Sequence, residues 1–321
     1  MKARTVVALA SLAGAALTGV VTTEASADLV TRCVGTGGAV TVPGDLVVPA
    51  GKACVLEGTT VEGKVTVQAG ADLVVTDGVF KGAVVVAENG YLDAYNTSVA
   101  GKVTSKGGYG VTFSASSLAA GYAGQAPADE SIVPFAYFED SAITKNVQSV
   151  SGELYVGGSE VAGAVSGDGT SYADVINSTI TKTFTVKNSP DGSVICGSEV
   201  DGAATWDGNG PVQVGGGGLI DDCSDVNYFG GDVAISNNAG GVVVNGNIIR
   251  GDLGGEGNDP APTGSDNRVR GEQTGQFADL QPAAAARRAA PEDHAAELKA
   301  KAGARKAAAV AEGEAAGSAG L

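Results

Sequence analysis

Apolar and polar residues alternate along this chain, and the alternation returns at a fixed interval. An apolar residue, a glycine two places later and a valine two places after that occur in the segments 61–65, 80–84 and 99–103, an interval of 19 residues. Apolar positions two residues apart are typical of a strand with one buried face. The pattern therefore predicts short strands that recur with a 19-residue period.

The repeat extends over most of the chain, with two longer intervals where residues are inserted. Its leading apolar positions are Val42, Val61, Phe80, Val99, Leu118, Ile143, Val161, Ile180, Val200, Leu219, Ile249 and Val269. A period of 19 residues is short for a strand and a crossover helix, but it fits one coil of a parallel β-helix, in which stacked strands lie about 4.8 Å apart. We predict an all-β, single-stranded parallel β-helix (β-solenoid) of about 12 coils over residues 28–281. The competing fold, a β-sandwich, requires no constant interval.

Glycine follows two places after the leading residue in eight of these twelve units, at positions 44, 63, 82, 101, 163, 202, 251 and 271. A glycine column in stacked coils indicates a sharp corner or a close approach of two backbones, where a Cβ would not fit.

The four cysteines fit the same arrangement. Cys33 and Cys54 are 21 residues apart, about one coil, and Cys196 and Cys223 are 27 apart, one coil and an insertion. Stacking brings such residues within the Cα distance that a disulfide spans. An even cysteine count with these spacings predicts two structural disulfides, Cys33–Cys54 and Cys196–Cys223.

The first 27 residues have the features of a secretory signal peptide. Lys2 and Arg4 precede an apolar stretch at residues 5–22, and Ala25-Ser26-Ala27 fits a signal-peptidase site. We predict cleavage after Ala27 and a secreted, extracellular product with no membrane insertion after removal of the signal. An uncleaved anchor is the alternative, because 18 mostly apolar residues are near the lower limit for spanning a bilayer.

Charge excludes some partners. Cleavage would remove Lys2, Arg4 and Glu24, which leaves 18 Lys and Arg against 35 Asp and Glu, a formal charge of −17. So acidic a surface repels nucleic acids.

Residues 282–321 are rich in alanine, and 291–312 have helical propensity, but Leu298 and Val310 are too sparse to form a packing stripe. We expect a mobile or marginally helical tail.

The first insertion, between Leu118 and Ile143, lies in an aromatic region. Tyr122, Phe135, Tyr137 and Phe138 are candidates for stacking on sugar rings. The alternative, that these rings pack the loop onto the rod, is favoured because aromatic side chains are usually buried.

The second insertion carries Asp221 and Asp222, which as paired carboxylates are similar to the acid and base of polygalacturonase-like glycosidases. That family also has Gly-His-Gly and Arg-x-Lys elements, whereas the only histidine here is His294. No motif ties Lys145, Lys182 or Lys187 to acids, as a pectate lyase would require. Carboxylates in glycine-rich corners are more often turn formers. We predict no catalytic residues, with Asp221 and Asp222 as the weaker alternative, and neither a metal nor a cofactor.

Four segments, 245–251, 257–264, 267–271 and 275–276, resemble the C-terminal coils of secreted actinobacterial right-handed β-helix proteins of unassigned function. Those proteins often have a cysteine where Phe277 stands here. The resemblance implies a right-handed, pectin-lyase-like fold and an extracellular place, without catalytic residues to carry over.

Two functions remain open. The favoured one is a non-catalytic structural or adhesive protein that presents loops to envelope or environmental glycans. The alternative is a lyase or hydrolase acting on acidic polysaccharide. Self-association through uncapped ends is a third hypothesis.

Overall fold

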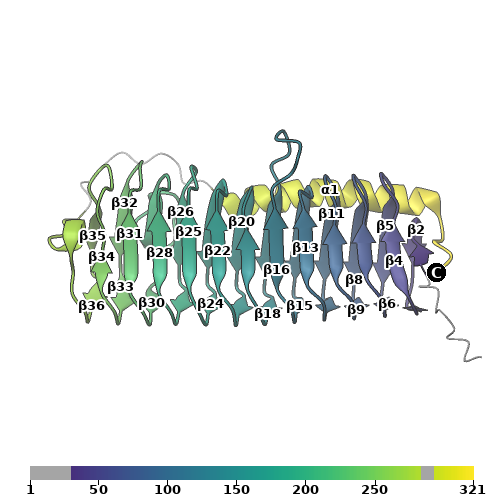
Figure 1. The fold of residues 1–321 in the computed structure, drawn as a ribbon, viewed down its shortest axis with the longest axis horizontal. Coiled ribbons are helices and arrows are strands. Elements are labelled where there is room, and N and C mark those ends of the chain that lie inside the picture. Colours follow the sequence, from purple (N-terminus) through teal and green to yellow (C-terminus); the bar gives the residue numbers. More distant parts are fainter. Residues whose placement is uncertain (1–29, 283–292) are drawn as a thin grey trace, which may run out of the picture.

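The computed structural model describes residues 30–282 and 293–321, so the predicted signal peptide lies outside the described residues. Residues 30–269 wind into a parallel β-helix in which each coil contributes one strand to each of three twelve-stranded sheets, here named A, B and C (Figure 1). Isolated bridges from Leu253 to Gln273 and from Thr263 to Gln281 begin a further, incomplete coil. The predicted fold and its coil number are confirmed.

The strands of each sheet follow one another at intervals of one coil. Sheet A comprises β1 (Val30–Arg32), β4 (Asp45–Val48), β7 (Val65–Val67), β10 (Val84–Val86), β13 (Val103–Lys106), β16 (Tyr122–Gln125), β19 (Val147–Ser149), β22 (Val165–Asp168), β25 (Phe184–Lys187), β28 (Ala204–Asp207), β31 (Val233–Ser236) and β34 (Leu253–Gly254). Sheet B comprises β2 (Gly35–Gly37), β5 (Ala53–Glu57), β8 (Asp72–Thr76), β11 (Tyr91–Tyr95), β14 (Gly110–Ser114), β17 (Phe135–Glu139), β20 (Glu153–Gly157), β23 (Tyr172–Ile176), β26 (Ser193–Cys196), β29 (Val212–Gly215), β32 (Val242–Asn245) and β35 (Thr263–Ser265). Sheet C comprises β3 (Thr41–Val42), β6 (Thr60–Val61), β9 (Val79–Phe80), β12 (Ser98–Val99), β15 (Ser117–Leu118), β18 (Ala142–Ile143), β21 (Glu160–Val161), β24 (Thr179–Ile180), β27 (Glu199–Val200), β30 (Asn227–Phe229), β33 (Asn247–Ile249) and β36 (Arg268–Val269).

The register places equivalent residues directly above one another. Val61 pairs with Phe80, and Phe80 pairs with Val99, as the 19-residue period predicts. One position was assigned wrongly: Phe229, not Leu219, stands between Val200 and Ile249 in this column. The error arises because the second insertion precedes β30, which leaves Leu219 in a loop with 37% of its surface exposed.

The glycine column marks close backbone contact between coils. A Cβ on Gly82 would overlap the carbonyl of Gly63, and one on Gly101 would overlap that of Gly82. This confirms the prediction that a side chain would not fit there.

Polar ladders complete the buried corners between sheets. At the corner from sheet B to sheet C, the backbone N–H of Ser116 donates to Ser141 Oγ at 3.1 Å, and the pattern repeats between successive coils. Asn227 Nδ2 continues it by donating to Asn247 Oδ1, and Asn247 Nδ2 donates to Asn267 Oδ1. These bonds satisfy donors that are removed from water. Sequence reasoning missed them, although the 20-residue spacing of these asparagines was a visible signal.

Both predicted disulfides are present, Cys33–Cys54 and Cys196–Cys223. The first joins stacked coils near the N-terminal end of the rod. The second ties the loop formed by residues 216–226 to β26.

The tail differs from the expectation of a mobile or marginally helical segment. Residues His294–Ala316 form one helix, α1, which runs back along the outer face of sheet B (Figure 1). At 1.5 Å per residue its length is about 34 Å, which matches eight strands about 4.8 Å apart, from β23 to β2. Leu298, Ala302 and Ala309 are at most 5% exposed on the packed side. Because alanine packs closely, few large apolar residues are needed.

Ion pairs supply the rest of this interface. Four cationic side chains of α1 form ion pairs with carboxylates on sheet B, with N–O distances of 2.7–2.8 Å. The pairs are Lys299–Glu139, Lys301–Glu153, Arg305–Asp72 and Lys306–Asp93. His294 Nδ1 lies 2.7 Å from Asp174 Oδ2, and its ring stacks on Tyr172 with centroids 3.9 Å apart. These partners are far from α1 in sequence, so composition alone did not reveal them.

Both ends of the rod are covered by the chain itself. Ser318 forms a parallel bridge with Thr36 in β2, and Leu321 packs against the core at the N-terminal end. At the other end the short helix η1 (Gly275–Phe277) places Phe277 in the core, fully buried.

Candidate functional site

Sheet B has a covered outer face, whereas sheet A leaves a groove open. Helix α1 covers sheet B from β2 to β23, and beyond it the loop 216–226 packs Ile220 against Val194 and Cys196. Because α1 lies along sheet B, it leaves the outer face of sheet A uncovered over the middle coils (Figure 1). A ligand that approaches the rod therefore meets sheet A without first displacing α1.

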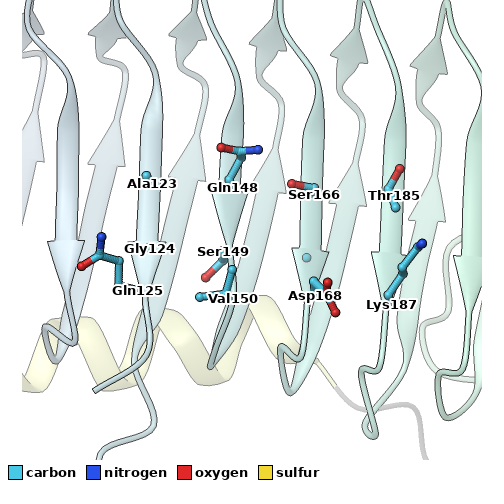
Figure 2. Close-up of a pocket in the computed structure, with 11 residues that line it drawn as sticks. Ala123, Gly124, Gln125, Gln148, Ser149, Val150, Ser166, Asp168, Thr185 and Lys187 are labelled. Atoms are coloured by element: carbon cyan, nitrogen blue, oxygen red, sulfur yellow. The ribbon is translucent and has the colours of Figure 1, made fainter. Parts of the chain in front are cut away.

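A groove of about 470 Å³, the sheet-A groove, crosses β16, β19, β22 and β25. Figure 2 shows Ala123, Gln148, Ser166 and Thr185 in one row across these strands, in agreement with their pairing in the ladder. A second row at the strand ends contains Gln125, Val150, Asp168 and Lys187. The outward residues of these strands form the two rows, and the small residues Gly124, Ser149 and Gly167, which alternate with them, also line the groove.

The chemistry of the groove is that of hydrogen bonding. Gln148 offers an amide, Ser166 and Thr185 offer hydroxyls, and Asp168 and Lys187 place one charge of each sign at one end. Asn188 Nδ2 donates to Asp168 Oδ1 at 2.8 Å, which orients that carboxylate. Small residues such as Ala123 and Gly124 leave the floor flat. Paired donors and acceptors on a flat floor suit a ligand rich in hydroxyl groups.

A second hollow of about 340 Å³, the lysine hollow, adjoins the groove because Gln148 lines both. It lies where sheet C turns into sheet A and is lined by Lys102, Ala120, Tyr122, Lys145, Asn146, Gln148 and Lys182. Three of these side chains are cationic, and none is a carboxylate. Sequence reasoning singled out Lys145 and Lys182 without linking them, and the structure brings them to one hollow.

The four aromatic residues considered for sugar stacking are buried. Tyr122 and Phe138 point into the rod, where their ring centroids lie 5.3 Å apart. Phe135 and Tyr137 lie on the outer face of sheet B beneath α1, each 2% exposed. In this arrangement all four rings pack against protein, which is the favoured of the two interpretations made from the sequence.

The paired aspartates belong to the loop that covers sheet B. Asp221 Oδ1 accepts the backbone N–H of Cys223 at 2.6 Å, which is a turn-forming bond. The Gln213 side chain fixes the same loop by accepting the N–H groups of Ile220 and Asp221. Asp222 is exposed. Neither aspartate lines the sheet-A groove or the lysine hollow.

No group of three or more His, Cys, Asp or Glu side chains able to hold a metal occurs among residues 30–282 and 293–321. Within the same residues, no helix is long and apolar enough to cross a membrane.

Burial perturbs several ionisable groups beneath α1. It raises the pKa of the Asp174 carboxyl, while the hydrogen bond and charge of His294 act in the opposite direction. Burial likewise raises the pKa of Asp72 against the effect of Arg305, and it raises the pKa of Tyr155 to about 12. These groups hold α1 in place and face away from the open groove.

Comparison with known proteins adds no relative: neither a protein-family model, nor a curated protein, nor a solved structure matches the chain.

Proposed function

We propose that this protein is a non-catalytic, extracellular structural or adhesive rod that binds a glycan in the sheet-A groove. The observation that carries the proposal is an open groove of about 470 Å³, lined by amide, hydroxyl and charged groups, on a wall of stacked strands. The wall itself would present the glycan site, in place of loop aromatics.

A rigid wall suits this role. Each strand that lines the groove is held by neighbours on both sides, and the coils beneath are filled by fully buried side chains such as Val147, Val165 and Phe184. Groups that are already fixed lose little conformational freedom when a ligand binds. Long glycans gain from repeated weak contacts at regular spacing along such a surface.

Absence of catalysis is supported by the placement of carboxylates. Glycoside hydrolysis generally uses two carboxyl groups that flank the bond to be cleaved. Asp168 is the one carboxylate that lines the sheet-A groove, and Asp221 is engaged in a turn of the loop over sheet B.

An extracellular place is supported by two disulfides and by the signal-like first 27 residues. The actinobacterial, pectin-lyase-like resemblance of the last coils points to the same place.

Binding to an immobilised glycan panel tests the function. Thr185→Trp should fill the groove and weaken retention of a bound glycan about tenfold or more. Thr66→Trp is the matched control, because Thr66 is the equivalent outward residue of β7, outside the groove. Equal retention by both variants would exclude the groove as the site.

Reducing-sugar and unsaturated-product assays should detect no turnover, and turnover that disappears in Asp221→Ala or Asp222→Ala would establish the enzymatic alternative.

A further inference from the structure

Four exposed lysines recur along the corner where sheet C turns into sheet A. They lie in the turns between β6 and β7, β12 and β13, β18 and β19, and β24 and β25, and they are Lys64, Lys102, Lys145 and Lys182. One coil without a member of the row lies between each lysine and the next, so the lysines recur every two coils. With strands about 4.8 Å apart, this lysine row has a repeat of about 10 Å along the rod axis.

The intervening turns carry no free positive charge. Residues 119–121 are Ala-Ala-Gly and residues 162–164 are Ala-Gly-Ala. In the remaining turn, Lys81 is neutralised by Glu62 at 2.8 Å. By contrast, none of the four lysines of the row has an ion pair within the part of the chain that the structure describes.

This strip of charge is local. The chain has a formal net charge of −16, and beyond both ends of the row the same corner carries acids, with Asp45 at the start of β4 on one side and Asp201 and Asp232 in turns on the other. Charges on a protein surface are screened over about 8–10 Å at physiological salt. Each lysine of the row therefore acts mainly on an anionic group placed next to it.

We infer that the lysine row binds an acidic polysaccharide in which a charged sugar alternates with an uncharged one. This inference rests on the proposed glycan-binding function. An extended disaccharide has a length close to the spacing of the row, so one anionic group per disaccharide meets one lysine. The lysine hollow, which contains Lys102, Lys145 and Lys182, lies along this row, and the adjoining groove, which shares Gln148, takes neighbouring hydroxyl groups. A polymer charged on every sugar would set half of its anions against the Ala and Gly turns.

The test compares three immobilised polymers of equal length at fixed ionic strength: hyaluronan, whose glucuronate alternates with a neutral sugar, polygalacturonate, charged on every sugar, and neutral dextran. Hyaluronan should bind at least fivefold more tightly than polygalacturonate, with dextran weakest. The test variant neutralises the row by combining Lys64→Gln, Lys102→Gln, Lys145→Gln and Lys182→Gln. Its affinity for hyaluronan should be about tenfold lower. The matched control removes the same number of charges elsewhere, with Arg32→Gln, Lys52→Gln, Arg268→Gln and Arg270→Gln, and should retain the affinity.

The outcomes separate the inference from the function beneath it. Binding of hyaluronan and polygalacturonate with equal affinity overturns the alternating pattern, and equal losses in both variants overturn the row as the site. In either case, glycan binding that is sensitive to Thr185→Trp leaves the proposed function standing. If no polysaccharide on the broader panel binds, the function and the inference fall together. Thermal unfolding of each variant verifies that the fold is intact.

Discussion

Replacing Leu298 with alanine should loosen α1 from sheet B more than the loss of the exposed Lys299–Glu139 pair. The Leu298 side chain is 1% exposed and packs among the aromatic residues of the middle coils. Truncation of a buried leucine costs about 2–5 kcal/mol, and we expect the lower end because one side of the contact is a surface helix. The Lys299–Glu139 pair has side chains that are 54% and 30% exposed, and such pairs contribute about 0.2–1 kcal/mol.

Hydrogen exchange of the α1 amides measures this difference directly, because local opening exposes them without unfolding the rod. A loss of about 2 kcal/mol corresponds to roughly thirtyfold faster exchange in Leu298→Ala, against fivefold at most in Lys299→Gln. Amides of sheet A should be unaffected in both variants. Equal acceleration in the two variants, or equal acceleration in α1 and sheet A, would refute the view that α1 is an independently opening element held mainly by Leu298.

Three further predictions concern the rod. Burial raises the pKa of Tyr155 to about 12, above that of a free phenol, so the contribution of the protonated Tyr155 to stability is complete below about pH 10 and is lost as the pH rises through 12. Tyrosinate absorbance during alkaline unfolding should show this loss, and deletion of residues 293–321 should make Tyr155 ionise at lower pH. Asn247→Ala should lower the free energy of unfolding in urea by about 1–3 kcal/mol because Asn227 and the Val214 carbonyl lose their partner, and an unchanged midpoint would contradict this. Gly82→Ala should lower the melting temperature by several degrees because its Cβ meets the next coil, whereas Gly38→Ala, with open space around it, should not.

The coil was predictable because its cause is local and periodic. Inward positions such as Val61, Phe80 and Val99 repeat with the chain, so their stacking follows from counting residues. The count failed once, at Leu219, where an insertion just before β30 displaced the frame and Phe229 took the buried position. The period therefore predicts buried positions only as far as an insertion, and the repeat must be aligned again after it.

The docking of α1 was not predictable in the same way. Its partners Asp72, Asp93, Glu139 and Glu153 lie more than 140 residues before it in sequence, and each one occupies an outward position of sheet B that taken alone appears solvated. Only their alignment on one face produces a complementary surface. The lysine row is an intermediate case, since its spacing of two coils is present in the sequence but acquires meaning only when the turns are stacked.

The same C-terminal segment that covers sheet B also closes the first coil, and this bears on self-association. Ser318 occupies the edge of β2, and Leu321 covers apolar side chains that a terminal coil would otherwise expose. An unpaired strand edge is the usual route to end-to-end stacking of β-structures. Here a second rod could add to this end only by displacing residues that α1 tethers through eight coils of contacts, so opening the end is coupled to releasing the helix. The hypothesis of assembly through uncapped ends therefore requires, at the N-terminal end, a prior rearrangement of α1.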